Sequence, residues 1–446
     1  MEGKDIQVSI IGGGLVGSLC ACVLAKHGIR VKLYEYRDDV RKTGIVDDGR
    51  RMNLVLSERG ISALRLAGLE DINKYTTPIT GRMMHKSDGT RVPFPMDNKG
   101  RCTYSIVRKD LNESFDNILC ITMTEKNPNV EIFFKHKFKS FDFKNRKFYL
   151  QGPEGEIKEK SSDLLIGCDG AHSAVRRQMA KTPRFDCSQS YFDNGYIEIT
   201  MPPTATGEFA MEGDYLHFWP RKSVMLAALP NKDRSYTVSL FMPFEIFEQL
   251  STREKLLQFF TENFPDAIPL IGKEKLVTDF FRITPSAMIT IKCNPYHIED
   301  KVMILGDAAH AMLPFNGQGM NAVSFEDCQI LSELLSLHNY DLRKVLPAFT
   351  NRRHKDAQIV SDLAKATFTI MKRHTSKKFL LRSKIDNLLN SIFPSWIVLS
   401  TEVAFSRNSY AECFARKQKQ DKILYLSLWS ILIVVFAFFV SVWARL

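Results

Sequence analysis

Three glycines near the N-terminus, Gly12, Gly14 and Gly17, have the spacing of a dinucleotide-binding turn. In that motif the first glycine permits a tight turn, the second lets a pyrophosphate approach the backbone, and the third lets the following helix pack on the preceding strand. Glu35 ends the next apolar run, where an acid can accept hydrogen bonds from ribose hydroxyls. These residues predict a site for FAD or NAD. A glycine-rich turn with a solvent-facing Glu35 is the alternative interpretation.

A second glycine-rich segment favours a flavin. Residues 304–321 read ILGDAAHAMLPFNGQGMN, so an apolar run ends in Gly306-Asp307 and a turn with a proline leads to Gly-Gln-Gly. A helix that begins there can offer N–H groups to the part of the flavin ring where negative charge develops on reduction. Asp307 can accept a hydrogen bond from a ribityl or ribose hydroxyl. We therefore predict FAD, and we interpret His310 as a packing or capping residue.

The elements that must position these motifs indicate an α/β fold. Residues 8–11 and 31–34 have the pattern of strands, and the segment between them has helical spacing. The segment 53–69 is predicted to be a loop followed by a helix, and the alternation in 191–242 predicts a second sheet. We expect a Rossmann-like FAD-binding domain interleaved with a sheet-containing substrate domain, then a helical C-terminal region and a transmembrane helix.

Domain boundaries follow from these patterns. The predicted ranges are 1–75, 106–180 and 291–345 for the FAD-binding domain, 76–105 and 181–290 for the substrate domain, 346–420 for the helical region, and 423–443 for the transmembrane tail anchor.

The last segment, Ile423 to Trp443, is uncharged and strongly apolar. At about 1.5 Å per residue a helix of this length spans roughly 30 Å, the thickness of a bilayer core. Basic residues lie on both sides of it, at positions 416, 417, 419, 422 and 445. A buried core helix is the alternative. A single span at this end of the chain predicts a tail anchor, a membrane as partner, and a catalytic part that faces the cytosol.

Composition excludes some other classes. The formal charge is +11, but no dense basic patch is interleaved with aromatic residues, so nucleic acid is not an expected partner. The nine cysteines, among them Cys20 and Cys22, lack the spacing of zinc or redox motifs. We predict no metal site. No signal peptide precedes the first strand, which together with the odd number of cysteines suggests a reducing compartment.

Three segments resemble the fingerprints of the single-component flavoprotein aromatic hydroxylases: the glycine turn at Gly12, CDGAHSAVR with Asp169-Gly170, and GDAAH with Gly306-Asp307. Their order and spacing match along most of the chain. Stretches such as VKLYEYRDDVR, DYLHFWPR and GDAAHAMLPFNGQGMN are similar to the kynurenine 3-monooxygenase branch. This resemblance runs from about residue 6 to residue 443.

The resemblance implies bound FAD, transient NADPH and O2, and hydroxylation of L-kynurenine to 3-hydroxykynurenine through a C4a-hydroperoxyflavin, a step of tryptophan degradation. It also implies the mitochondrial outer membrane. No catalytic side chain is assigned, because the flavin carries the chemistry. The cofactor-binding residues expected from the motifs and the resemblance are Gly12, Gly14, Leu15, Gly17, Glu35, Arg37, Leu54, Arg108, Asp169, Gly306, Asp307, Gly319, Met320 and Asn321.

The resemblance also implies a substrate pocket, in which Arg82 would hold the substrate carboxylate. The other implied pocket residues are Phe94, Thr367, Met371 and Tyr410. Phe94 stands where the family has a tyrosine, Thr367 where it has an asparagine and Ile370 where it has a glutamate. Because a hydrogen bond to a charged group contributes about 1.5–3 kcal/mol, losing two would weaken kynurenine binding by roughly two or more powers of ten.

The altered pocket leaves two alternatives open. One is a related flavin monooxygenase with a different aromatic or apolar substrate, and the other is a flavin-binding protein without turnover. The oligomeric state is not predicted.

Overall fold

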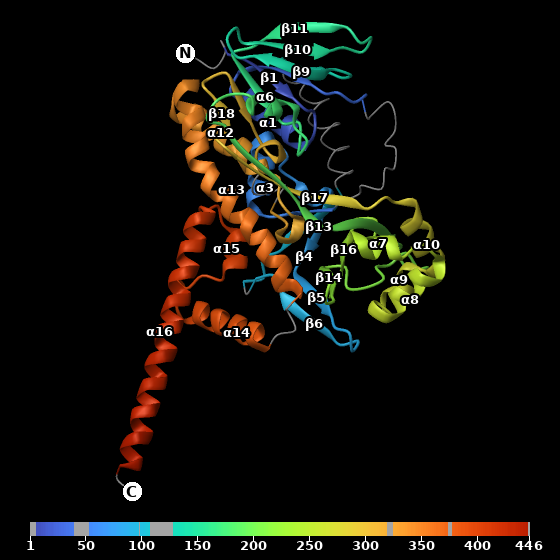
Figure 1. The fold of residues 1–446 in the computed structure, drawn as a ribbon, viewed down its shortest axis with the longest axis vertical. Coiled ribbons are helices and arrows are strands. Elements are labelled where there is room, and N and C mark those ends of the chain that lie inside the picture. Colours follow the sequence, from blue (N-terminus) through green and yellow to red (C-terminus); the bar gives the residue numbers. More distant parts are fainter. Residues whose placement is uncertain are drawn as a thin grey trace. The chain divides into compact units, whose positions relative to one another are not determined.

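The structure is a computed structural model that describes residues 6–39, 53–97, 99–107, 128–318, 324–372 and 377–444. The chain forms two units, Met1–His374 and Thr375–Leu446. Figure 1 shows their helices and strands, coloured along the sequence. Of the residues predicted to bind cofactor or substrate, Tyr410 belongs to the second unit and the others to the first.

The glycine turn is part of a largely parallel sheet. Strands β1 (Gln7–Ile11) and β2 (Arg30–Tyr34) pair in parallel, and α1 (Leu15–Lys26) connects them. Small and apolar side chains dominate α1 because the helix is buried along most of its length. The predicted strand–helix–strand unit is confirmed. The sheet order is β18-β19-β12-β1-β2-β8, and its further strands are β8 (Val130–Phe133), β12 (Leu164–Gly167), β18 (His297–Ile298) and β19 (Val302–Ile304).

This sheet brings the three motifs together. β12 pairs in parallel with β1, and β19 pairs in parallel with β12. Parallel strands end at the same edge of a sheet, where ligands of such folds bind. Gly12, Asp169 and Gly306 each follow one of these strands closely, so they lie near one another although they are far apart in the sequence.

Two smaller sheets have three strands each. The segment that begins at Asn53 is not the predicted loop: its four residues pair with β7, and a run this short has too few residues for its period to be recognised. The helix predicted after it is confirmed. The elements of this part are β3 (Asn53–Leu56), α3 (Glu58–Ala67), η2 (Ile72–Lys74), β4 (Thr77–Ile79) and β7 (Thr103–Val107). The other sheet consists of β9 (Lys137–Asp142), β10 (Lys147–Gln151) and β11 (Ile157–Ser161), followed by α6 (Ala174–Met179).

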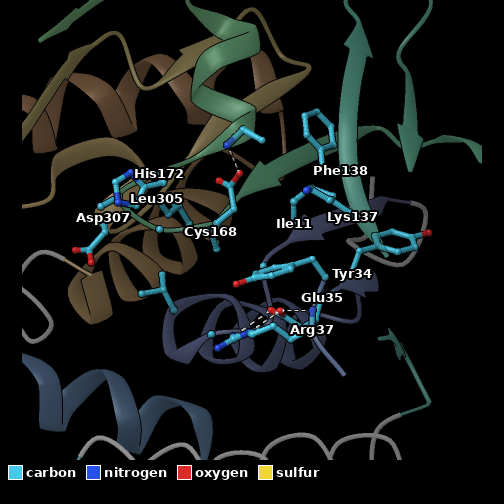
Figure 2. A pocket seen from close by; sticks show the side chains of 18 of the residues that line it. Ile11, Tyr34, Glu35, Arg37, Lys137, Phe138, Cys168, His172, Leu305 and Asp307 are labelled. Atoms are coloured by element: carbon cyan, nitrogen blue, oxygen red, sulfur yellow. Dashed lines mark hydrogen bonds and ion pairs between the residues drawn. The ribbon is translucent and has the colours of Figure 1, made fainter. Parts of the chain in front are cut away.

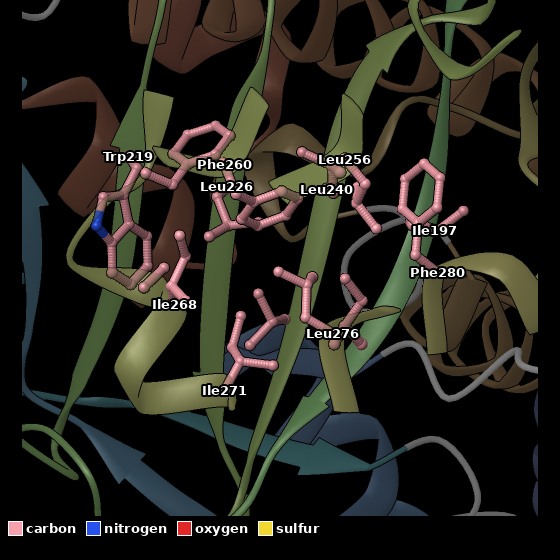
Figure 3. Packing of buried hydrophobic residues seen from close by; sticks show 14 of the residues in the cluster. Ile197, Trp219, Leu226, Leu240, Leu256, Phe260, Ile268, Ile271, Leu276 and Phe280 are labelled. Carbon is pink, nitrogen blue, oxygen red and sulfur yellow. The ribbon is translucent and has the colours of Figure 1, made fainter. Parts of the chain in front are cut away.

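The predicted second sheet has seven strands in the order β17-β13-β16-β15-β14-β5-β6. One face packs against four helices, and Figure 3 shows Trp219, Leu226, Leu240 and Phe260 in the apolar core between them. The strands are β5 (Gly81–His85), β6 (Arg91–Pro95), β13 (Asp186–Met201), β14 (Tyr215–Pro220), β15 (Met225–Pro230), β16 (Tyr236–Pro243) and β17 (Ser286–Asn294). The helices are α7 (Phe244–Gln249), α8 (Arg253–Asn263), α9 (Ala267–Ile271) and α10 (Lys273–Arg282).

Side chains alternate between the two faces of each strand. Leu226 and Leu240 point into the helical core, so their neighbours Ala227 and Phe241 point to the opposite face. That opposite face borders a cavity described below.

The C-terminal part is helical, as predicted. The first unit contains α11 (Asp307–His310), η4 (Pro314–Asn316), α12 (Glu326–Leu337) and α13 (Leu342–Lys372). The second unit contains α14 (Lys377–Ile392), α15 (Leu399–Phe405) and α16 (Tyr410–Trp443). Residues 410–438 of α16 form a helix long and apolar enough to cross a membrane. The predicted sevenfold division into domain ranges stays a prediction.

Candidate active site

A cavity of about 520 Å³ lies at the edge of the parallel sheet where β1 and β12 end (Figure 2). Residues from the three motifs line it. Those predicted to bind the cofactor are Gly12, Gly14, Leu15, Glu35, Arg37, Asp169 and Asp307. Three further basic residues line the cavity although no feature of the sequence indicated them: Lys137, His172 and Arg177. We call this space the dinucleotide cavity.

The glycine turn has the geometry that its spacing predicts. Gly12 has φ +102°, and a methyl group there would lie 2.5 Å from the carbonyl oxygen of Cys168. A methyl group at Gly17 would lie 1.9 Å from the Gly12 carbonyl oxygen, so α1 can pack this closely only with glycine. A methyl group at Gly14 would meet no atom of the described chain within 4 Å. The open space at Gly14 fits a pyrophosphate at the start of α1.

Glu35 directly follows β2 and is buried, and its carboxylate stabilises the glycine turn that follows β1. Its Oε2 accepts a hydrogen bond from the Gly13 N–H at 2.7 Å. Its Oε1 accepts one from Arg37 Nε at 2.8 Å, and Figure 2 shows these two side chains together. Burial opposes ionisation of Glu35, but the hydrogen bond and charge of Arg37 outweigh it and hold the pKa of Glu35 below its ordinary value. Each carboxylate oxygen can accept more than one bond, so ribose hydroxyls remain possible partners.

Asp169 connects the cavity to α6. Its Oδ2 accepts hydrogen bonds from the N–H groups of Ala174 and Val175 at 2.6 and 3.1 Å. Burial raises the pKa of Asp169. Its Oδ1 is buried without a hydrogen-bond partner in the described part of the chain. A ligand hydroxyl or an ordered water could satisfy that oxygen.

A second cavity of about 320 Å³ lies against the open face of the seven-stranded sheet. Ala171 and Asp307 line both cavities, so the two spaces adjoin at these residues. Most of its walls are apolar, and they come from the seven-stranded sheet, from β3, from the segment 311–317 and from α13. They include Leu54, Leu216, Met225, Phe241, Met288, Phe315 and Thr367. We call it the substrate cavity.

Arg82 is the basic residue of the substrate cavity that could bind an anionic group of a ligand. It lies on β5 and lines the substrate cavity. Burial lowers the pKa of its guanidinium group. Among the described residues that line this cavity there is no ion-pair partner for Arg82, although a half-buried cation is usually stabilised by one. The arrangement fits an anionic ligand.

Two other predicted substrate residues differ in their relation to the substrate cavity. Thr367 of α13 lines the cavity directly. Phe94 stands opposite Arg82 on the neighbouring strand β6, but it is not a lining residue. Leu54, predicted to contact FAD, lines the substrate cavity.

An aromatic cluster at the substrate cavity was missed by sequence reasoning. The ring centroids of Tyr196 and Phe241 are 5.8 Å apart, those of Phe241 and Phe315 are 5.1 Å apart, and those of Phe315 and Phe368 are 4.4 Å apart. The alternation in β13 and β16 placed Tyr196 and Phe241 on the face opposite the core. That signal could have indicated them.

Several predicted site residues cannot be placed in this way. Arg108, Gly319, Met320 and Asn321 lie outside the described residues. Met371 belongs to α13, but its side chain also lies outside them. Tyr410 belongs to the second unit and is buried. Gly306 has φ +61° at the start of α11. The binding roles of all these residues stay predictions.

A buried ionic network fixes the loop that carries Asp307. Asp327 of α12 accepts hydrogen bonds from His310 Nε2 at 2.7 Å, from the Gly306 N–H at 3.1 Å and from Arg353 Nε at 2.7 Å. Burial opposes its ionisation, but the charges of His310 and Arg353 hold its pKa below the ordinary value. His310 is therefore part of a buried hydrogen-bonded network, and Asp327 positions the Gly306-Asp307 segment. The packing or capping role predicted for His310 stays a prediction.

We expect Asp327→Asn to destabilise the protein by about 3 kcal/mol, because removing one partner of a buried ion pair leaves the other charge uncompensated. Thermal unfolding with and without added FAD measures this. Asp362→Asn is the matched control, because Asp362 pairs with Lys292 at the surface with 68% of its side chain exposed. Equal melting temperatures of the two variants would contradict a positioning role.

Comparison with known proteins identifies the fold. The family model for an FAD binding domain matches residues 5–364. Among solved structures, 2-methyl-3-hydroxypyridine-5-carboxylic acid oxygenase superposes with a TM-score of 0.66 at 21% identity, over 82% of this chain and 92% of its own. At this identity the likeness concerns the fold alone.

Closer relatives are found by sequence. Kynurenine 3-monooxygenase of Anopheles gambiae is 46% identical over 95% of this chain and 87% of its own length. The enzyme of the same name from Sus scrofa is 43% identical over 95% of this chain and 90% of its own length. The family suggested by the three motifs is thereby confirmed. The chain belongs to the kynurenine 3-monooxygenase family of FAD-dependent aromatic hydroxylases.

Proposed function

We propose that this protein is an NADPH- and FAD-dependent monooxygenase that hydroxylates L-kynurenine to 3-hydroxykynurenine. The observation that carries this proposal is the position of Arg82, a cation in a largely apolar cavity that adjoins the dinucleotide cavity at Ala171 and Asp307. The substrate named for the relatives is an aromatic amino acid, which has an apolar ring and a carboxylate. The apolar walls of the cavity suit the ring, and Arg82 suits the carboxylate.

The residues of the dinucleotide cavity fit FAD. The open side of Gly14 and the start of α1 would hold the pyrophosphate, Glu35 a ribose, and Asp307 a hydroxyl near the junction of the two cavities. When bound, FAD supplies the redox chemistry, because it accepts a hydride from NADPH and activates O2. NADPH is proposed as a transient reductant, since the sequence contains one glycine turn of this kind.

The chain itself binds, orients and shields the substrate. Arg82 can form two parallel hydrogen bonds to a carboxylate, which fixes both position and direction. Side chains such as Met225, Phe241 and Phe315 exclude water around the ring. Thr367 stands where a longer polar side chain is expected in the family, so Arg82 is the main polar anchor that we propose.

A comparison of two ligands tests the carboxylate role. We expect L-kynurenine to stimulate NADPH oxidation at a concentration roughly a hundredfold below that needed for kynuramine, the same molecule without the carboxylate, because two hydrogen bonds to a charged group are lost. Steady-state rates over a range of each ligand measure this. Equal half-saturating concentrations would mean that the cavity recognises the ring alone.

We further propose that α16 anchors the protein in the mitochondrial outer membrane, with the catalytic part in the cytosol, and that the product enters NAD biosynthesis. Large apolar side chains along α16 are exposed, among them Phe436 at 71% and Trp443 at 80%. Exposing such a surface to water is costly, and a bilayer would cover it.

Deleting residues 423–446 is expected to move the protein from the membrane pellet to the supernatant after alkaline carbonate extraction. A matched control keeps the composition of 423–443 but scrambles its order, and it should remain in the pellet because apolar length decides insertion. A deletion variant that stays in the pellet would contradict a single anchor.

A further inference from the structure

Two cysteines face each other on β13 and β17, the last two strands at one edge of the seven-stranded sheet. β13 and β17 are antiparallel, and their register places Cys187 directly opposite Cys293. β13 pairs with β16 only from Asn194 onward, so the stretch that carries Cys187 is paired with β17 alone among the described strands. Figure 1 shows β13 and β17 side by side as two long strands.

The two thiols are in contact. Their Sγ atoms are 3.3 Å apart, and a disulfide bond needs about 2.0 Å, so closure requires a movement of little more than 1 Å. Directly opposite residues of an antiparallel pair have Cβ atoms about 4.5–5.5 Å apart, and a disulfide needs about 3.5–4.5 Å, so closure also draws the two strands slightly together. Both cysteines are free.

The two thiols differ in access. Cys187 is exposed, whereas Cys293 is buried at 2% exposure. An oxidant in solution can therefore reach Cys187 first, and Cys293 is in place to attack the oxidised sulfur. A resolving cysteine beside an accessible one is the arrangement found at redox-sensitive thiols.

We propose that Cys187 and Cys293 form a peroxide-sensitive dithiol site that closes to a cross-strand disulfide. The Cys187 sulfur attacks the O–O bond of hydrogen peroxide, which gives a sulfenic acid and one water. The Cys293 sulfur then attacks the Cys187 sulfur, so that the S–S bond forms, the S–O bond breaks and a second water leaves. In total two thiols are oxidised and one peroxide is reduced to two waters.

The strand that carries Cys293 also contributes residues to the substrate cavity. Met288 and Ile289 of the same strand β17 line the substrate cavity, and Ile291 donates its N–H to the Ala311 carbonyl in the segment that follows Asp307. A disulfide would fix the two strands beside these residues. Burial raises the pKa of Cys293, which slows its attack on the oxidised Cys187 sulfur.

The enzyme supplies a source of this oxidant. A flavin monooxygenase that consumes NADPH without hydroxylating a substrate returns O2 as hydrogen peroxide. This source rests on the proposed function, whereas the chemistry of the thiol pair does not, so the test uses added peroxide and separates the two.

Full-length protein in detergent is treated with hydrogen peroxide, its remaining thiols are blocked with N-ethylmaleimide, and non-reduced peptides are mapped by mass spectrometry. We expect one linked peptide pair that contains Cys187 and Cys293 and weighs two hydrogen atoms less than the separate peptides. The melting temperature should rise by on the order of 5 °C, because the bond closes a long loop.

Variants make the test specific. Cys187→Ser should abolish the link and leave Cys293 reduced, whereas Cys293→Ser should leave a Cys187 sulfenic acid that dimedone traps. Cys102→Ser is the control, because the Cys102 thiol interacts with Tyr104 and has no thiol partner among the described residues, and it should leave the link unchanged. Oxidation of wild-type Cys187 to a sulfinic acid without a link, or protection of Cys187 equal to that of Cys293, would overturn the proposal.

Discussion

Replacing Arg82 by methionine is expected to raise the KM for L-kynurenine by on the order of a hundredfold while FAD stays bound. Arg82 lines the substrate cavity with a guanidinium whose pKa is lowered by burial. Two hydrogen bonds between a guanidinium and a carboxylate contribute about 1.5–3 kcal/mol each, which corresponds to this factor or more. Methionine keeps the length and apolar stem of the side chain, so the cavity walls should hold. Steady-state kinetics and flavin absorbance measure the two quantities.

Arg91→Met is the matched control for this change. Arg91 lies on the adjacent strand β6, but it pairs with Glu212 at the surface with 51% of its side chain exposed. Its replacement should leave KM within about twofold, because exposed ion pairs contribute little. If both variants keep the wild-type KM, Arg82 does not hold the carboxylate and the substrate assignment loses its main support.

Two alanine substitutions in the glycine turn are expected to have different effects, one on the stability of the fold and the other on FAD affinity. Gly17→Ala should destabilise even the protein without FAD, by about 3 kcal/mol or more, because the added methyl group would lie 1.9 Å from the Gly12 carbonyl oxygen. Gly14→Ala should leave that protein within about 0.5 kcal/mol of the wild type, because its methyl group meets no described atom within 4 Å. The same methyl group would occupy the space proposed for the pyrophosphate, so FAD affinity should fall roughly a hundredfold.

Thermal unfolding of the two apoproteins and titration with FAD, followed by quenching of flavin fluorescence, measure both quantities. Each glycine variant serves as the other's control, since the two changes add the same methyl group. Normal FAD affinity in Gly14→Ala would show that the pyrophosphate lies elsewhere.

The parts of the fold that depend on residues close together in the sequence could be predicted from residue type and spacing. Gly12, Gly14 and Gly17 identified the turn because their roles depend on neighbours within one strand–helix–strand unit. The order of the three glycine and aspartate segments, together with a resemblance, was enough to predict FAD. Arg82 was predicted from the resemblance as well, and the structure places it in the substrate cavity.

Features that depend on long-range pairing could not be predicted. β3 was read as a loop because its pairing with β7 is not visible in four residues. The alternation within β13 indicates the face on which Tyr196 lies, but the meeting of that face with the turn that carries Phe315 arises only in the folded chain. Asp327 likewise reaches the Gly306 N–H from another helix, and no local spacing signals that contact.

The most direct test is NADPH oxidation by the detergent-solubilised full-length protein, with and without L-kynurenine, with the product examined by mass spectrometry. The proposed function predicts that L-kynurenine stimulates NADPH oxidation and that the product is heavier by one oxygen atom. Bound FAD without stimulation, or stimulation without a product of that mass, would contradict it, and the cavity beside Arg82 would then serve another aromatic acid or none.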